Sequence, residues 1–252
     1  MQQTEYETVV SRYIGKGVRI IELNRPECLN AMNHQLISDV ARAFEDANAE
    51  ADSRALVFTG AGKSFCAGDD RREHSHPETE AQAREVVDNI QQVTRTILQG
   101  PKPVVGAING YAVGGGFEWA LNCDFSIWNE NSAAFFPEVS LNLFVTGAVT
   151  AILPALVGHT KAREMLMLGD RYSAQQLHQL GVAWRVAKDD CVLDEAIELA
   201  RRLAALPELS LRTMRRVLNQ VDAGIERALA LETEATVQGF LDPLTTKLLK
   251  DF

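Results

Sequence analysis

A buried strand, a glycine-containing loop and a helix follow one another twice in this chain, around residues 56–73 and around residues 104–121. Strands that are apolar along their whole length are typical of parallel sheets, whose connections run through helices on both faces. The alternation therefore predicts an α/β fold with parallel strand pairing. Propensity alone leaves open whether the strands form an open sheet or a spiral.

The remaining pattern completes this α/β interpretation. Residues 7–24 hold two short strand patterns divided by Gly15, Lys16 and Gly17, which predicts a hairpin. Asn33 is a candidate N-cap, and a long helical pattern ends before Gly100. We expect further strands at residues 54–60, 103–110, 124–128 and 183–187, and later helices at 147–158, 160–169, 173–181, 192–206, 208–223 and 224–239.

Charge and cysteine usage narrow the class of protein. The 252 residues carry a net charge of −9, which gives no electrostatic attraction for nucleic acid or an anionic membrane, so we expect neither as a partner. The four cysteines form no C-x-x-C pair, and the N-terminus resembles no signal peptide. We expect a cytoplasmic protein with reduced thiols and no metal site, with His74 and His76 solvated in a polar loop.

Two glycine-rich segments invite a nucleotide-binding interpretation that their spacing excludes. The segment TGAGKS, residues 59–64, has Val57 where a phosphate-binding loop needs its first glycine. The order G-x-G-x-x-G is absent around Gly110 and Gly114, so a dinucleotide-binding turn is excluded as well.

The stretch NGYAVGGGFEWALNCD, residues 109–124, places three consecutive glycines at the start of a predicted helix. The first N–H groups of a helix lack internal partners and lie at the positive end of its dipole. Glycine lets a ligand approach that backbone, which suits an oxygen that gains negative charge during a reaction. The alternative is a tight packing point that only glycine fits, and the residues alone favour neither interpretation.

Two acidic residues stand in apolar surroundings. Glu118 lies in FEWAL, and Glu138 lies in AAFFPEVSL. A first-turn acid often only complements the helix dipole, but a buried carboxyl has a raised pKa and suits proton transfer near neutral pH. Two such groups are the usual equipment of general acid–base catalysis.

Five blocks together resemble the crotonase superfamily, the enoyl-CoA hydratase/isomerase group, over roughly residues 8–205. They are NRPECLNAMN (24–33), TGAGKSFCAGDD (59–70), KPVVGAINGYAVGGGFEWALNCD (102–124), FFPEVSL (135–141) and ALVGHTKAREMLMLGDRYSAQQLHQLGVAWRV (155–186). The resemblance implies a spiral of repeated ββα units over residues 1–190 and a C-terminal helical trimerisation region over 191–252. It also implies a homotrimer or a dimer of trimers, an acyl-CoA thioester as substrate, and no cofactor besides the coenzyme A carried by that substrate.

The resemblance also assigns roles to residues. The backbone N–H groups of Asp69 and Gly115 would hold the thioester oxygen as it becomes enolate-like. Glu118 would deprotonate a water that attacks Cβ, and Glu138 would protonate Cα. The other candidate substrate- or coenzyme-A-binding residues are Arg25, Ala67, Gly68, Asp70 and Gly114.

Possession of both acids favours an enoyl-CoA hydratase. The alternatives are a Δ3/Δ2 enoyl-CoA isomerase or another acyl-CoA lyase of the family, and a non-catalytic acyl-CoA-binding member. Two features depart from the family pattern. Asp69 stands where a small apolar residue is usual, and residues 141–150 lack the proline and most glycines of L-G-x-x-P-G-x-G-G. The acyl group and the pathway, fatty acid metabolism among them, stay open.

Overall fold

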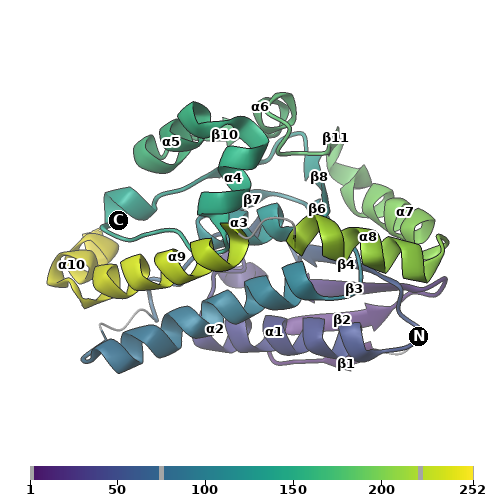
Figure 1. Cartoon of the computed structure of the whole chain (residues 1–252), viewed down its shortest axis with the longest axis horizontal. Coiled ribbons are helices and arrows are strands. Elements are labelled where there is room, and N and C mark those ends of the chain that lie inside the picture. The colour runs from purple at the N-terminus through teal and green to yellow at the C-terminus, as the bar shows by residue number, and fades with distance from the viewer. Residues whose placement is uncertain (1–2, 74–76, 221–223, 252) are drawn as a thin grey trace.

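The strands of the computed structural model, which describes residues 3–73, 77–220 and 224–251, form two sheets (Figure 1). The larger sheet has the order β1-β2-β3-β4-β6-β8-β11, and the smaller has the order β10-β9-β7-β5. The strands are β1 (Gln3–Glu5), β2 (Val9–Tyr13), β3 (Val18–Leu23), β4 (Ala55–Gly60), β5 (Ser64–Cys66), β6 (Val104–Ile108), β7 (Tyr111–Val113), β8 (Phe125–Asn129), β9 (Ala133–Phe135), β10 (Tyr172–Ser173) and β11 (Arg185–Ala187).

The predicted hairpin and the predicted parallel pairing are both confirmed. β2 pairs with β3 antiparallel, whereas β3, β4, β6, β8 and β11 pair in parallel. Residues of β4 and β6 are buried on both faces, as expected for strands covered by other layers.

Helices connect and cover these sheets. They are α1 (His34–Ala49), α2 (Glu80–Gln99), α3 (Gly115–Asn122), α4 (Val149–Val157), α5 (His159–Leu168), α6 (Ala174–Gln179), α7 (Val192–Ala204), α8 (Glu208–Gln220), α9 (Gly224–Leu241) and α10 (Pro243–Asp251), with short 3-10 turns η1 (Pro26–Cys28), η2 (Glu138–Leu141) and η3 (Asp189–Cys191). Asn33 is the N-cap of α1, because its side chain accepts a hydrogen bond from the N–H of Leu36 at 2.9 Å.

Successive turns of the chain repeat one ββα unit. β4, β5 and α2 form one turn, and β6, β7 and α3 form the next, so that each turn gives one strand to each sheet. The long helical pattern expected to end before Gly100 is confirmed as α2, which begins later than the approximate bounds 56–73 of the first repeat. The segment after β5 pairs with Met32 in an isolated bridge, and the helix begins only at Glu80.

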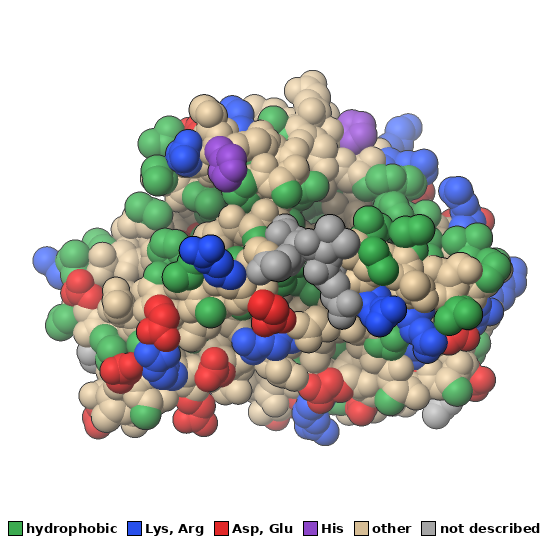
Figure 2. Space-filling model, viewed as in Figure 1, with side chains coloured by type: hydrophobic (Ala, Val, Ile, Leu, Met, Phe, Trp, Pro, Cys, Tyr) green, Lys and Arg blue, Asp and Glu red, His purple; other side chains and the backbone are tan. Residues whose placement is uncertain are grey.

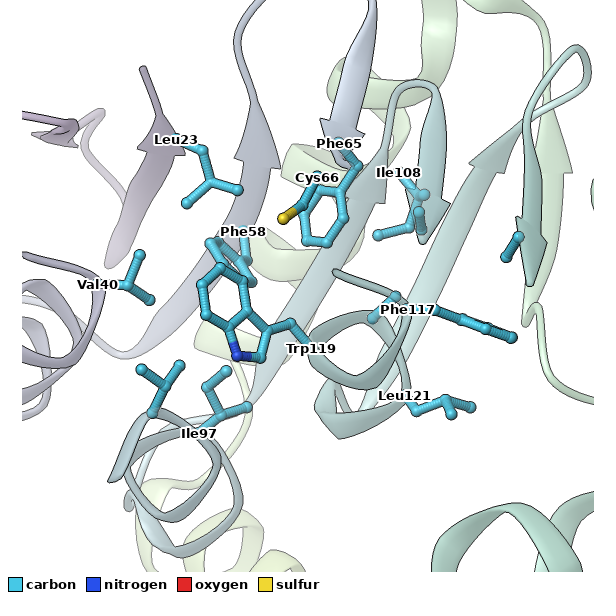
Figure 3. Packing of buried hydrophobic residues seen from close by; sticks show 14 of the residues in the cluster. Leu23, Val40, Phe58, Phe65, Cys66, Ile97, Ile108, Phe117, Trp119 and Leu121 are labelled. Atoms are coloured by element: carbon cyan, nitrogen blue, oxygen red, sulfur yellow. The ribbon is translucent and has the colours of Figure 1, made fainter. Parts of the chain in front are cut away.

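Aromatic packing fixes the short helix α3 from two sides. Trp119 packs beside Phe58 at a centroid distance of 6.0 Å, and Phe117 stacks on Phe136 at 4.6 Å. Figure 3 shows Trp119 pointing toward Phe58 and Phe117 pointing to the other side of α3. Because both anchors are fully buried, Glu118 between them has a fixed position on the helix.

The large sheet packs against α1 on one face and against α7 on the other. Val57 and Val105 pack there with Ala196 and Ala200, whereas Leu56 and Phe58 belong to the cluster on the α1 side. Figure 1 shows α7 and α8 at the right of the molecule, and Figure 2 shows apolar side chains exposed beside them. The domain boundary near residue 190 stays a prediction.

Some expectations need correction or lie outside the described residues. β1, β5, β7, β10 and α10 were not expected from the sequence, since most are only two or three residues long. The helix expected over 208–223 is described to Gln220, and its last three residues lie outside the described part of the chain, as do His74 and His76. Within the described residues, no helix is long and apolar enough to span a bilayer.

Candidate active site

Two of the three glycines, Gly114 and Gly115, meet both acids and the Asp69 loop in one cavity of about 100 Å³. Its polar and glycine-rich wall is contributed by Ala67, Gly68, Asp69, Arg71, Gly114, Gly115, Glu118, Glu138, Thr146 and Thr236. Its apolar wall is contributed by Met32, Ile90, Val113, Pro137, Leu141, Leu143, Phe144, Phe240 and Leu249. Residues that are far apart in the sequence therefore surround one small apolar space with two carboxyl groups in it.

A Cβ at each of the three glycines, Gly114, Gly115 and Gly116, would meet a different neighbour. Gly114 has φ +52° and ψ −124°, and a Cβ there would lie 2.6 Å from Oε1 of Glu138. A Cβ on Gly115 would lie 2.6 Å from the Met32 methyl group, and one on Gly116 would lie 2.4 Å from the Cys66 carbonyl. Tight packing therefore explains Gly116, while Gly114 gives the carboxyl group of Glu138 access to the helix start.

The backbone around Asp69 is held by Met32. The N–H of Met32 donates to the Gly68 carbonyl at 2.7 Å, and the N–H of Asp70 donates to the Met32 carbonyl at 2.9 Å. In such a parallel bridge the residue between the two bonded ones directs its own N–H away from the partner strand. The amide of Asp69 thus faces away from Met32, and both Asp69 and Gly115 line the cavity.

Glu118 is buried and hydrogen-bonded. Only 2% of its surface is exposed, Oε1 accepts from the N–H of Thr146 at 2.8 Å, and Oε2 accepts from the Thr146 hydroxyl at 2.5 Å. Burial raises the pKa of Glu118 to about 7, the Thr146 hydrogen bonds oppose that rise, and the Glu232 carboxylate adds to it. Glu118 therefore exchanges its proton close to neutral pH.

Glu138 is also buried, but one of its carboxyl oxygens has no hydrogen bond among the described residues. Its side-chain oxygen Oε2 has no hydrogen-bond partner among the described residues, although only 9% of the residue is exposed. Burial and the neighbouring Glu118 carboxylate raise the pKa of Glu138 well above its ordinary value. Both carboxyl groups therefore keep their protons to a higher pH than an exposed glutamate does.

The other predicted binding residues lie at or beside this cavity. Ala67 and Gly68 form its wall. Arg25 instead holds the adjacent loop, because it pairs with the buried Asp70 at 3.0 Å and with Glu73 at 3.3 Å. A hollow of about 580 Å³ continues outward from the Asp69 loop. The basic residues on its wall are Arg71, Arg72 and Lys250.

Sequence reasoning missed residues that complete the site from distant segments. Thr146 lies 28 residues beyond Glu118, and Phe240 and Leu249 come from α9 and α10, where the resemblance was weak. The one available signal was the atypical segment 141–150, which contains Thr146. Within the described residues, no cluster of His, Cys, Asp and Glu side chains is arranged to hold a metal ion.

The sequence is similar to a known protein family and to individual members of it. The sequence profile of the enoyl-CoA hydratase/isomerase family matches residues 13–249. The chain is 31% identical to a 1,2-epoxyphenylacetyl-CoA isomerase of Escherichia coli, over 88% of this chain and 86% of the relative. It is 32% identical to a crotonyl-CoA hydratase of Syntrophomonas wolfei, over 91% of this chain and 88% of the relative.

The fold is also similar to that of a solved crystal structure. The crystal structure of an enoyl-CoA hydratase/isomerase from Mycobacterium paratuberculosis superposes with a TM-score of 0.90 and 28% identity. The match covers 97% of this chain and 98% of that one. The expected fold, a crotonase-type spiral of ββα units with a C-terminal helical region, is therefore confirmed.

Proposed function

The chain belongs to the enoyl-CoA hydratase/isomerase family, and we propose that it adds water reversibly to the double bond of a 2-enoyl-CoA thioester. The observation that carries this proposal is the pair of buried carboxyl groups, Glu118 and Glu138, which share one cavity but differ in hydrogen bonding: Thr146 donates twice to Glu118, whereas Oε2 of Glu138 has no partner among the described residues. Addition of water needs one group that takes a proton and another that gives one.

The thioester oxygen is stabilised first in this mechanism. The N–H of Gly115, at the positive end of α3, and the N–H of Asp69 hold the carbonyl oxygen. Attack at Cβ moves the double-bond electrons toward this oxygen, which becomes an enolate. Two well-placed donors stabilise such a charge by several kcal/mol in the transition state.

The two acids divide the proton transfers. Glu118, ionised above a pKa of about 7, takes a proton from the water whose oxygen bonds to Cβ. Glu138, still protonated, gives its proton to Cα as the enolate collapses to the saturated thioester. Each positioned proton transfer contributes about 10²–10⁴-fold to the rate. The next water returns the proton from Glu118 to Glu138 and resets the pair.

The outer hollow suits the coenzyme A part of the substrate. Arg71, Arg72 and Lys250 lie on its wall and supply positive charge for phosphate groups in a protein of net charge −9. The exposed apolar side chains of Leu209, Met214 and Leu218 on α8 suit a subunit contact. We propose that the chain assembles through such contacts as a homotrimer or a dimer of trimers. A cytoplasmic location is proposed as well.

Crotonyl-CoA in an absorbance assay tests the hydratase proposal. The conjugated thioester band should disappear as 3-hydroxybutyryl-CoA forms, and mass spectrometry should show the addition of one water. The rate should fall below about pH 7, where Glu118 becomes protonated. Binding of crotonyl-CoA without formation of the water adduct would contradict the proposal and would favour the non-catalytic alternative.

An isomerase that moves a double bond between Cβ–Cγ and Cα–Cβ is the second candidate. It is favoured by one observation: Thr146 occupies both oxygens of Glu118, whereas Oε2 of Glu138 is unpartnered among the described residues. A single mobile acid would then carry the proton between the two carbons. Formation of 2-enoyl-CoA from 3-enoyl-CoA, with no hydroxyacyl product, would support this candidate over the hydratase.

A further inference from the structure

A third buried acid, Glu232 on α9, takes no part in the mechanism above. It is fully buried, and its two carboxyl oxygens accept hydrogen bonds from one short segment. Oε2 accepts from the N–H of Ala148 at 2.8 Å, and Oε1 accepts from the N–H and the hydroxyl of Thr150 at 2.8 and 2.7 Å. Burial raises the pKa of Glu232, and the hydrogen bonds from Thr150, Ala148 and Gln91 oppose that rise, so these contacts favour its carboxylate form at the start of α4.

The segment that Glu232 holds, residues 146–150, has a strained backbone. Ala148 adopts φ +57°, a left-handed conformation that residues with a Cβ rarely adopt. Gly147 precedes it at φ +69°, and a Cβ there would lie 2.7 Å from Cβ of Glu118. The strained turn therefore lies directly against the acid that we assign as the base, and something must keep it in place.

Two other buried polar side chains, Gln91 and Asn122, also hydrogen-bond the turn at residues 146–150. The N–H of Gly147 donates to the Gln91 side chain at 3.2 Å, and the Gly147 carbonyl accepts from the Asn122 side chain at 2.8 Å. Gln91 also hydrogen-bonds Glu232. Among these contacts Glu232 alone supplies a charge, and charged acceptors make the stronger hydrogen bonds.

We propose that Glu232 is a positioning residue for Glu118: it holds the turn at 146–150 so that Thr146 presents both its N–H and its hydroxyl to that carboxyl group. The role of Glu118 as base rests on the proposed function, but the contacts do not. If the turn relaxed, Glu118 would lose two donors that stabilise its ionised form, and its pKa would rise.

A simple charge effect of Glu232 predicts the opposite sign. The Glu232 charge itself raises the pKa of Glu118, so its removal without movement of the turn would lower that pKa. The other charged or titratable groups around Glu118 are Glu138, Asp69 and Arg71, all on the wall of the same cavity, and none of them is altered by a change at Glu232. The direction of the shift therefore separates positioning from long-range electrostatics.

The test is titration of the Glu118 carboxyl group in the Glu232→Gln variant. The substrate-free protein carries ¹³C-labelled glutamate, and the Glu118 signal is assigned from Glu118→Gln. We expect a higher Glu118 pKa than in the natural protein. The matched control is Glu234→Gln, the same change on the same helix at an exposed residue that pairs with Arg84, which should leave the Glu118 pKa unchanged. An unchanged or lowered pKa in Glu232→Gln would overturn the proposal.

Thr150→Val keeps the proposal testable if Glu232→Gln does not fold, and a double variant tests the path through Thr146 if it does. Thr150→Val removes the hydroxyl hydrogen bond to Glu232 and should raise the Glu118 pKa by a smaller amount; no rise would overturn the proposal. When Glu232→Gln folds, its effect should shrink in a Thr146→Val background, because one of the two donors is already gone. An undiminished effect there would show that Glu232 does not act through Thr146.

Kinetics add a second readout when the natural protein hydrates crotonyl-CoA. Glu232→Gln should lower kcat about tenfold or more with little change in KM, since misplacement of a catalytic group costs chemistry before binding. The titration needs no substrate. A protein that shows the pKa rise but lacks hydratase activity would refute the proposed function and leave the positioning role standing.

Discussion

Glu118 and Glu138 are the same residue type in the same cavity, yet their surroundings differ. Burial raises the pKa of Glu118, which is 2% exposed, to about 7, and raises the pKa of Glu138, which is 9% exposed, well above its ordinary value. The difference lies in hydrogen bonds: Thr146 donates twice to Glu118, whereas Oε2 of Glu138 has no partner among the described residues. Burial is the main cause of the raised pKa in both groups; the Thr146 donors oppose the rise at Glu118, and the Glu118 charge adds to the rise at Glu138.

The largest expected effect comes from removing either acid. Glu118→Gln and Glu138→Gln should each lower hydration of crotonyl-CoA by about 10²–10⁴-fold, because each removes one proton transfer. Coenzyme A binding, measured by calorimetry, should remain. The control Glu234→Gln should keep full activity, since that side chain is exposed on α9 and paired with Arg84. Normal turnover in either acid variant would remove the assigned roles.

Exchange of the substrate's Cα protons with solvent distinguishes the roles of Glu118 and Glu138. Exchange of the Cα protons of a saturated acyl-CoA in D₂O needs only the group that faces Cα. Glu118→Gln should therefore retain more of this exchange than Glu138→Gln. The reverse order would exchange the assignments of the two carboxyl groups.

A smaller effect is expected on stability. The pKa of Glu118 rises from 4.5 to about 7 on folding, so the folded protein binds this proton more tightly than the unfolded chain does. The stabilising contribution is complete below about pH 4.5 and is lost as the pH rises through 7, by on the order of 3 kcal/mol. Urea unfolding at pH 4 and pH 8 should show the natural protein losing this much stability relative to Glu118→Gln. A difference that is independent of pH would contradict the raised pKa.

The parts of the site that sequence could predict are those carried by local pattern. Glu118 and Glu138 stand out because acids in apolar segments are unusual, and the glycines mark a helix start that needs close approach. Long apolar strands such as β4 and β6 are equally clear, because they are buried on both faces.

The parts that could not be predicted depend on contacts between distant segments. Nothing near Glu118 in the sequence shows that Thr146 donates to it, or that Glu232 on α9 holds the intervening turn. The strands β5 and β7 are three residues long and lie in glycine-rich stretches, so their pattern is too short to detect. In the second repeat the helix follows the glycine-rich loop at once, whereas in the first repeat Asp69 forms a bridge to Met32 and α2 begins only at Glu80.

The most direct test of the central claim is titration of both carboxyl groups in the same substrate-free protein, by ¹³C signals assigned through the two glutamine variants. Glu118 should be half-ionised near pH 7 and Glu138 should still be protonated there, losing its proton only at higher pH. Ionisation of Glu138 before Glu118, or of both groups already at about pH 5, would contradict the assigned roles.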